Sequence, residues 1–167
     1  MTSAGGTEGP VRLDDPAVRD ILRRARVARI ATLSRNGRPS INPLYFVRAG
    51  GRIWLGTAEW TLAARNVQAD PRVSVLFTVE ADPGDRRVLR IRGRGTVRTD
   101  RRTLRAHDLR VALRYVLAPG ALRHLLAHAG KLRLRRAYHR QNADRGAPCV
   151  IEVIPEEAEL LTAERPG

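Results

Sequence analysis

Apolar and polar residues alternate along much of the N-terminal half of the chain with the two-residue period of β-strands. Three such segments are separated by Asn36-Gly37 and by Gly50-Gly51. Asn-Gly is a strong signal for a tight hairpin turn because both of its residues adopt positive φ. The segments cover residues 27–34, 39–48 and 52–57. The pattern therefore predicts three antiparallel strands joined by short turns.

Helical spacing of apolar residues predicts two helices in the same half. The first begins at residues 14–16, where an acidic N-cap precedes a proline in the first turn, and ends near Arg26. The second covers residues 58–69 and is stopped by the Asp-Pro pair at 70–71. Further strands are predicted at residues 72–80, 88–98 and 148–154.

The strand at 88–98 alternates strictly between two kinds of residue. One face carries Leu89, Ile91, Gly93, Gly95 and Val97, and the other carries Arg90, Arg92, Arg94 and Arg98. The four arginines repel one another unless solvent or an anion screens them. We interpret this stripe as a solvated outer face, as a site for a phosphate or polycarboxylate, or as a nucleic-acid surface. The two glycines lie within a strand, so they indicate a close backbone approach or a bend, not a dinucleotide-binding turn.

Residues 100–142 change to a helical pattern. Asp100 is a candidate N-cap for a helix that reaches Val116, Pro119 opens a second helix, and a third covers 131–141. The order of helices and hairpin-joined strands favours a small barrel over a doubly wound sheet. We expect one domain over residues 13–155, between a flexible tail at 1–12 and a frayed acidic tail at 156–167.

Composition narrows the possible classes of protein. The 167 residues carry a formal net charge of +14, yet 43% of them are apolar, which excludes a disordered basic tail. The segment 86–145 holds eighteen basic residues against three acidic ones, so the excess charge belongs to it. No apolar run is long enough for a membrane span, and the N-terminus has no signal-peptide pattern. We therefore expect a cytoplasmic protein that does not enter a membrane.

Few side chains form a constellation typical of catalysis. Cys149 opens an apolar strand with no base beside it, which favours a buried structural thiol. His124 and His128 have the spacing of two metal ligands on one helix face, but no third ligand is evident, so we predict no metal site. We assign no catalytic residue.

Six short motifs follow one another between residues 18 and 100. They are Arg29-Ile-Ala-Thr-Leu33, Asn36-Gly37-x-Pro39, Pro43-Leu-Tyr-Phe46, Ile53-Trp-Leu-Gly-Thr57, Arg65-Asn66-Val67-x-x-Asp70-Pro71-Arg-Val73 and Gly93-Arg-Gly-Thr-Val-Arg-Thr-Asp100. In this order they resemble the pyridoxamine 5'-phosphate oxidase-like superfamily of flavin-binding split β-barrels, whose members use FMN or the deazaflavin F420. Cys149–Pro155 resembles the closing strand of that barrel.

The resemblance implies an α+β fold: a six-stranded antiparallel split β-barrel with flanking helices and a helical insertion, at about residues 101–142, before the last strand. It also implies a homodimer with FMN or F420 at the subunit interface. The cofactor phosphate falls at Thr57, Thr61, Arg65 and Asn66. The ring system falls at Asn42, Pro43 and Leu44.

The resemblance does not extend to every basic contact of the true pyridoxamine phosphate oxidases. Asn42 and Val47, and likewise Leu62 and Ala63, stand where those enzymes have arginine or lysine. We therefore expect a different oxidoreductase, which uses FMN or F420 to transfer hydride or electrons to a small organic substrate. The alternatives are a non-catalytic flavin- or F420-binding protein on the same fold and an arginine-rich nucleic-acid-binding module. The basic insertion supplies Tyr115, His124, His128 and Tyr138 as candidate cleft residues, or else only packs on the barrel.

Overall fold

Two tight turns fold the first part of the chain into a meander of antiparallel strands. In the computed structural model, which describes residues 8–116 and 146–162, the hairpin turns contain Gly37, Gly50 and Gly51 at φ of +73°, +56° and +78°. Glycine adopts these angles without steric cost. The predicted meander is therefore confirmed, but Asn36 does not adopt the positive φ expected of an Asn-Gly turn. Its strands are β2 (Val27–Leu33), β3 (Pro39–Ala49) and β4 (Arg52–Ala58).

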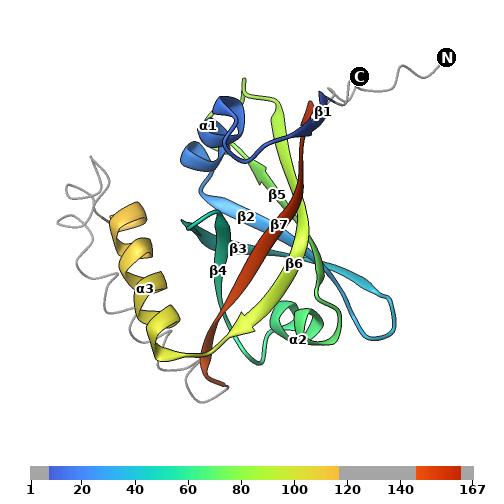
Figure 1. Ribbon diagram of the computed structural model, residues 1–167, viewed down its shortest axis with the longest axis vertical. Coiled ribbons are helices and arrows are strands. Elements are labelled where there is room, and N and C mark those ends of the chain that lie inside the picture. The colour runs from blue at the N-terminus through green and yellow to red at the C-terminus, as the bar shows by residue number, and fades with distance from the viewer. Residues whose placement is uncertain (1–7, 117–145, 163–167) are drawn as a thin grey trace.

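The described strands close into a barrel (Figure 1). The remaining strands are β1 (Glu8–Val11), β5 (Arg72–Thr78), β6 (Arg87–Arg98) and β7 (Pro148–Thr162). Neighbouring strands pair in the order β1-β7-β4-β3-β2-β5-β6, and β6 pairs back with β7. All these pairings are antiparallel. The predicted α+β fold with a six-stranded antiparallel barrel is confirmed, with β1 added at the edge of β7.

Helices lie at both ends and along one side of the barrel (Figure 1). They are α1 (Pro16–Arg24), α2 (Leu62–Ala69), α3 (Arg101–Val111) and a turn of π-helix, η1 (Ala112–Val116). Asp15, Thr61 and Asp100 cap the three α-helices by accepting backbone N–H bonds, as such residues do at N-caps. Apolar side chains of α1 and α2 join those of the barrel interior in one core. In this core the rings of Phe46 and Phe77 pack edge to face, with their centroids 4.8 Å apart.

Both predicted tails are wrong at their inner ends. Within the tail expected at 1–12, residues 8–11 form β1, and within the tail expected at 156–167, β7 continues to Thr162. Ala158 and Leu160 face the core, at 4% and 6% exposure, and acidic residues alternate with them. In the sequence, the many acidic residues obscure this alternation. In the fold, arginines of β6 pair with the carboxylates and allow the strand to continue.

The second helix begins later than predicted. Residues 58–69 were expected to be helical, but β4 runs to Ala58 because it pairs there with Pro148, and α2 begins only at Leu62. The predicted helix from Asp100 is confirmed. The helices expected from Pro119 and over 131–141 lie outside the described residues.

Gly93 lies where β6 and β7 approach most closely. A Cβ on Gly93 would lie 2.2 Å from the carbonyl oxygen of Ile154, and the strand register shifts at this point. A Cβ on Gly95 would lie 3.0 Å from Val67 of α2. The interpretation of these glycines as points of close approach is therefore confirmed.

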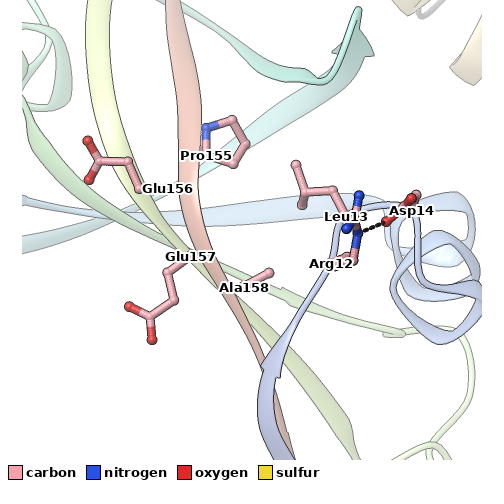
Figure 2. A pocket seen from close by; sticks show the side chains of 7 residues that line it. All are labelled: Arg12, Leu13, Asp14, Pro155, Glu156, Glu157 and Ala158. Atoms are coloured by element: carbon pink, nitrogen blue, oxygen red, sulfur yellow. Dashed lines mark hydrogen bonds and ion pairs between the residues drawn. The ribbon is translucent and has the colours of Figure 1, made fainter.

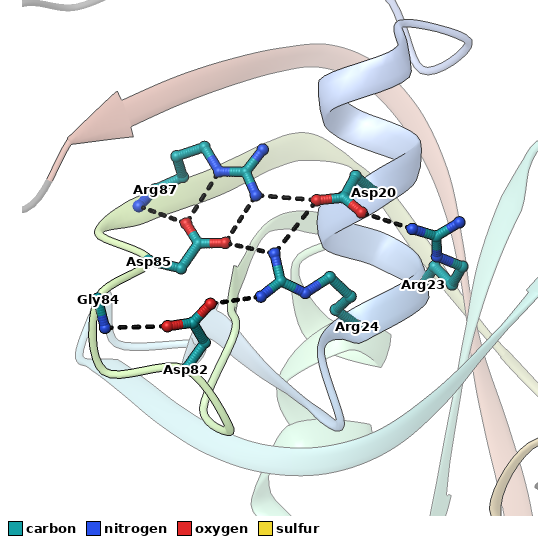
Figure 3. Close-up of polar contacts among 7 residues, drawn as sticks. All are labelled: Asp20, Arg23, Arg24, Asp82, Gly84, Asp85 and Arg87. Carbon is teal, nitrogen blue, oxygen red and sulfur yellow. Dashed lines mark hydrogen bonds and ion pairs between the residues drawn. The ribbon is translucent and has the colours of Figure 1, made fainter. Parts of the chain in front are cut away.

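An ion-pair network ties the loop between β5 and β6 to α1 (Figure 3). Arg24 contacts Asp82 at 2.7 Å and Asp85 at 2.8 Å, and Arg87 contacts Asp20 at 2.9 Å. The Asp85 side chain is only 6% exposed. Hydrogen bonding to Arg87, followed by the charges of Arg87 and Arg24, lowers the pKa of Asp85 to about 2 despite burial. Asp85 is thus the acidic centre of the network.

Replacing Asp85 by asparagine is expected to lower the free energy of unfolding by about 2 kcal/mol at neutral pH, because Arg24 and Arg87 lose a shared anion. The folded pKa of Asp85 lies below its ordinary value of 3.8, so its stabilisation is present above about pH 4 and disappears as the pH falls towards 2. Urea unfolding at several pH values should show the difference shrinking in that window. Glu156→Gln, at an exposed position, is the control. A difference independent of pH would contradict this role.

Candidate functional site

Two threonine hydroxyls meet where β4 leads into α2. The Oγ1 atoms of Thr57 and Thr61 lie 3.0 Å apart. Thr61 donates to the carbonyl oxygen of Ala58 at 2.8 Å and accepts from the N–H of Ala64 at 3.4 Å. The first N–H groups of a helix lack partners within it, and the helix dipole is positive at this end. The sequence thus builds a polar corner with helix N–H groups here, and Glu59 lies in the same turn.

Arg65 and Asn66 follow on α2 but lie in different environments. Arg65 is exposed and has no carboxylate within 4.0 Å in the part of the chain that the structure describes. Asn66 is only 4% exposed, and its Nδ2 donates to Thr32 Oγ1 at 3.0 Å and to Ser40 Oγ at 3.1 Å. Arg65 is therefore accessible to an anion, whereas the amide nitrogen of Asn66 fixes α2 to β2 and β3.

The three ring-contact candidates on β3 lie on two faces of the strand. Asn42 and Leu44 are half-buried, and Leu44 packs against the core, while Pro43 is exposed on the opposite face. Ile41 and Tyr45 share that outer face and are 63% and 58% exposed. The barrel thus presents an apolar outer surface at the point where the resemblance places the ring system.

The arginine stripe on β6 is largely paired across the barrel seam. Arg90 Nε donates to Glu159 Oε2 at 3.0 Å, Arg92 Nη2 contacts Glu157 at 3.1 Å, and Arg98 Nε contacts Asp100 at 3.3 Å. Arg94 has no carboxylate within 4.0 Å among the residues described. Because β7 supplies most of these partners, the stripe offers less unpaired charge to an external anion or nucleic acid than its sequence indicates.

The insertion after β6 is anchored to the barrel by two residues. Arg114 Nη2 donates to the carbonyl oxygens of Leu22 and Ala25, both at 2.7 Å. The Tyr115 hydroxyl lies 2.8 Å from the carbonyl oxygen of Phe46 and 3.0 Å from that of Arg26. The end of this segment therefore packs on α1 and β3. His124, His128 and Tyr138 lie outside the described residues.

Sequence reasoning missed His107, which α3 holds against β4. Its ring is 8% exposed, and a Cβ on Gly56 would lie 2.6 Å from its Cε1. Within residues 8–116 and 146–162, Nε2 has no hydrogen-bond partner, while Nδ1 lies 3.3 Å from Asp108 Oδ1. The sequence did contain a signal for it. His107 follows Thr103 by four residues on the predicted helix, which places both side chains on one face, and that face is buried.

Cys149 is confirmed as a buried free thiol. Burial, assisted by the nearby Glu59 carboxylate, raises its pKa to about 11. It is therefore protonated at neutral pH and is not a nucleophile. Within residues 8–116 and 146–162, no group of three His, Cys, Asp or Glu side chains is arranged to hold a metal ion. None of the described helices is long and apolar enough to cross a membrane.

A pocket of about 520 Å³ lies between the segment before α1 and the middle of β7 (Figure 2). Arg12 and Asp14 pair with each other at 3.1 Å on one side of it. Glu156 and Glu157 point away from that side. Its polar groups do not converge on one point, so we assign it no ligand.

A closed antiparallel barrel with a helix at each end, and with a hydroxyl pair at the start of one helix, defines a protein of the split-barrel class. A family model described as pyridoxamine 5'-phosphate oxidase matches residues 14–161. The chain belongs to this family, within the superfamily of FMN- and F420-binding split barrels. The resemblance carried by the six motifs is confirmed.

Solved structures support the same fold at low sequence identity. An F420 reductase is 20% identical, with a TM-score of 0.57, and the match covers 83% of this chain and 93% of that one. The heme storage protein HutZ from Vibrio cholerae is 16% identical, with a TM-score of 0.61 and coverages of 91% and 96%. A pyridoxamine 5'-phosphate oxidase-related, FMN-binding protein from Nostoc punctiforme is 20% identical, with a TM-score of 0.58 and coverages of 91% and 85%. Among curated proteins, no match was found.

Proposed function

We propose that this protein is an oxidoreductase that uses FMN or F420 and acts on a small organic substrate. The observation that carries the proposal is the corner formed by Thr57, Thr61 and the exposed Arg65 within a chain of this family. Helix N-terminal N–H groups, hydroxyls and a guanidinium are the donors that a phosphate prefers. The likeness to an F420 reductase and to an FMN-binding protein supports the same cofactor class.

The residues present fit the phosphate of such a cofactor. The two hydroxyls lie 3.0 Å apart, and because Thr61 donates to Ala58, Thr57 is the donor in this contact. The Thr57 hydroxyl would turn its proton from Thr61 to a bound phosphate. Arg65 adds a full positive charge one helical turn away. Asn66 holds the corner in place from inside, through Thr32 and Ser40. When bound, the flavin or deazaflavin supplies the hydride- or electron-transfer chemistry, and the protein's residues bind it, orient it and exclude water.

We further propose that a second copy of the chain covers the cofactor. The exposed apolar residues Ile41, Tyr45 and Leu62 lie on β3 and at the start of α2, beside the proposed phosphate and ring contacts. A monomeric site here would leave these side chains, and one face of a bound ring, in water. A homodimer removes both from solvent.

A non-catalytic cofactor-binding protein on this fold is the second candidate. Cys149 is protonated at neutral pH and the amide nitrogen of Asn66 is bonded internally, so neither of them serves as a base in the described site. The likeness to a heme storage protein supports the same alternative. The two candidate functions differ only in whether the protein with bound cofactor turns over a substrate.

Spectroscopic titration of the purified protein with FMN and with F420 tests the proposal. We expect one of the two to give a saturable change at one cofactor per chain, and sedimentation of the same sample to show two chains per particle. The bound, reduced cofactor should then pass electrons to small organic acceptors faster than the free cofactor does. Saturable binding without any such acceleration favours the second candidate, and the failure of both cofactors to bind overturns the cofactor site itself.

A further inference from the structure

A basic pocket of about 540 Å³ lies at the end of the barrel opposite α2. Its walls come from α1, from the end of β3 and from η1. The charged side chains that line it are Arg19, Arg23, Arg48, Arg114 and Asp20. Its volume lies within the usual range of small-molecule sites. The cofactor corner at Thr57, Thr61 and Arg65 lies on other elements, so this pocket is a separate feature.

The positive charge of this pocket exceeds its negative charge. Among the described residues that line it, Asp20 is the one carboxylate, and Arg23, Arg24 and Arg87 already surround it at 2.7, 3.4 and 2.9 Å (Figure 3). Arg19 and Arg48 are exposed, and neither has a carboxylate within 4.0 Å in the described ranges. The pocket therefore gathers two guanidinium groups, those of Arg19 and Arg48, that no carboxylate of the described residues neutralises.

Arg114 forms the fixed wall of the pocket. The carbonyl oxygens of Leu22 and Ala25 hold its Nη2, and its guanidinium carbon lies 4.3 Å from the centre of the Phe46 ring. Its Nε is buried and has no hydrogen-bond partner among the residues that the structure describes. Burial lowers the pKa of Arg114; the contact with Tyr115 opposes this shift, and the charges of Arg26 and Arg48 add to it. Helix-end carbonyls carry only partial negative charge, so the charge of Arg114 is held in place without being neutralised.

We propose that this pocket binds a small polyanion, a compound with at least two phosphate or carboxylate groups. Arg114 is the fixed positive base, and Arg19 and Arg48 close on the anion from α1 and from β3. Guanidinium groups bind phosphate and carboxylate oxygens in a bidentate manner, which suits either chemistry. A concave surface of one charge sign also concentrates such ligands from solution.

Calorimetric titration of the full chain with pyrophosphate and with citrate, at fixed ionic strength, tests the site. We expect saturable binding of at least one of them at one anion per chain. The double variant Arg19→Gln/Arg48→Gln should weaken it at least tenfold, because two charge-assisted contacts are lost. The control Arg35→Gln/Arg38→Gln removes the same charge from the exposed turn between β2 and β3, and should stay within twofold. The anion that binds more tightly identifies the ligand as a phosphate or a carboxylate.

Equal losses in the two double variants would overturn the proposal, because they would show attraction to net charge alone. Failure of the unmodified chain to bind either anion would do the same. A measurement without variants supports or refutes the location: backbone amide signals of α1 and η1 should shift on titration, and shifts confined to α2 would place the anion at the cofactor corner instead. Arg65→Gln should leave pyrophosphate binding in this pocket unchanged, because Arg65 lies at the cofactor corner. Failure of the polyanion proposal can therefore be distinguished from failure of the cofactor proposal.

Discussion

Replacing Gly93 by alanine is expected to lower the free energy of unfolding by at least about 3 kcal/mol, a large share of the stability of a domain of this size. The added Cβ would lie 2.2 Å from the carbonyl oxygen of Ile154 and 3.1 Å from the Cα of Pro155. Both atoms belong to the backbone of β7, so no side-chain rotation relieves the contact. Since the pairing of β6 with β7 closes the barrel, the strands must separate at the seam.

Two other glycines provide graded controls. In Gly95→Ala the new Cβ meets a methyl group of Val67 at 3.0 Å, and in Gly84→Ala it meets only the flexible carboxylate of Asp82 at 3.3 Å. We therefore expect Gly93→Ala to be the most destabilising, Gly95→Ala intermediate and Gly84→Ala the mildest. Urea unfolding followed by circular dichroism gives the three values. A Gly93 variant as stable as the Gly84 variant would show that the seam relaxes freely.

The parts of the fold set by local physics could be predicted from the sequence. The turns at Gly37 and Gly50-Gly51, and the helix capped by Asp100, depend on residues within a few positions of one another. The ends of the chain depend on distant partners instead. β1 exists because β7 offers an edge at residues 158–160, and residues 156–162 remain a strand because arginines of β6 neutralise their carboxylates.

The residues of the candidate site show the same difference between local contacts and contacts with distant parts of the chain. Thr57 and Thr61 were reached through the family resemblance, which placed the cofactor phosphate at both, and their hydroxyls do meet at the turn into α2. The burial of Asn66 was not predictable, since its partners Thr32 and Ser40 lie on strands more than twenty residues away. The basic pocket at Arg114 was missed for the same reason: its walls come from three separate parts of the chain.

Arg65→Gln is expected to weaken binding of whichever cofactor the protein takes by about thirtyfold to 150-fold, as the loss of a charged hydrogen bond worth about 2–3 kcal/mol requires. Glutamine keeps the first three carbons and the polarity of the side chain, but it is shorter and removes the positive charge. Thr57→Val, which removes one hydroxyl at nearly constant volume, should have a smaller effect of about fivefold. Thr61 is unsuitable for this test because its hydroxyl also caps α2.

Fluorescence or absorbance titration with the cofactor measures these affinities. Arg38→Gln is the matched control, because it removes the same charge from an exposed arginine in the turn between β2 and β3. If Arg65 contacts the phosphate, only its variant loses affinity, and the loss is greater for the phosphorylated cofactor than for its dephosphorylated form. Equal weakening in the Arg65 and Arg38 variants would mean that the net charge attracts the cofactor and that α2 does not bind its phosphate. Loss of affinity in Thr57→Val alone would keep the hydroxyl corner but exclude Arg65 from it.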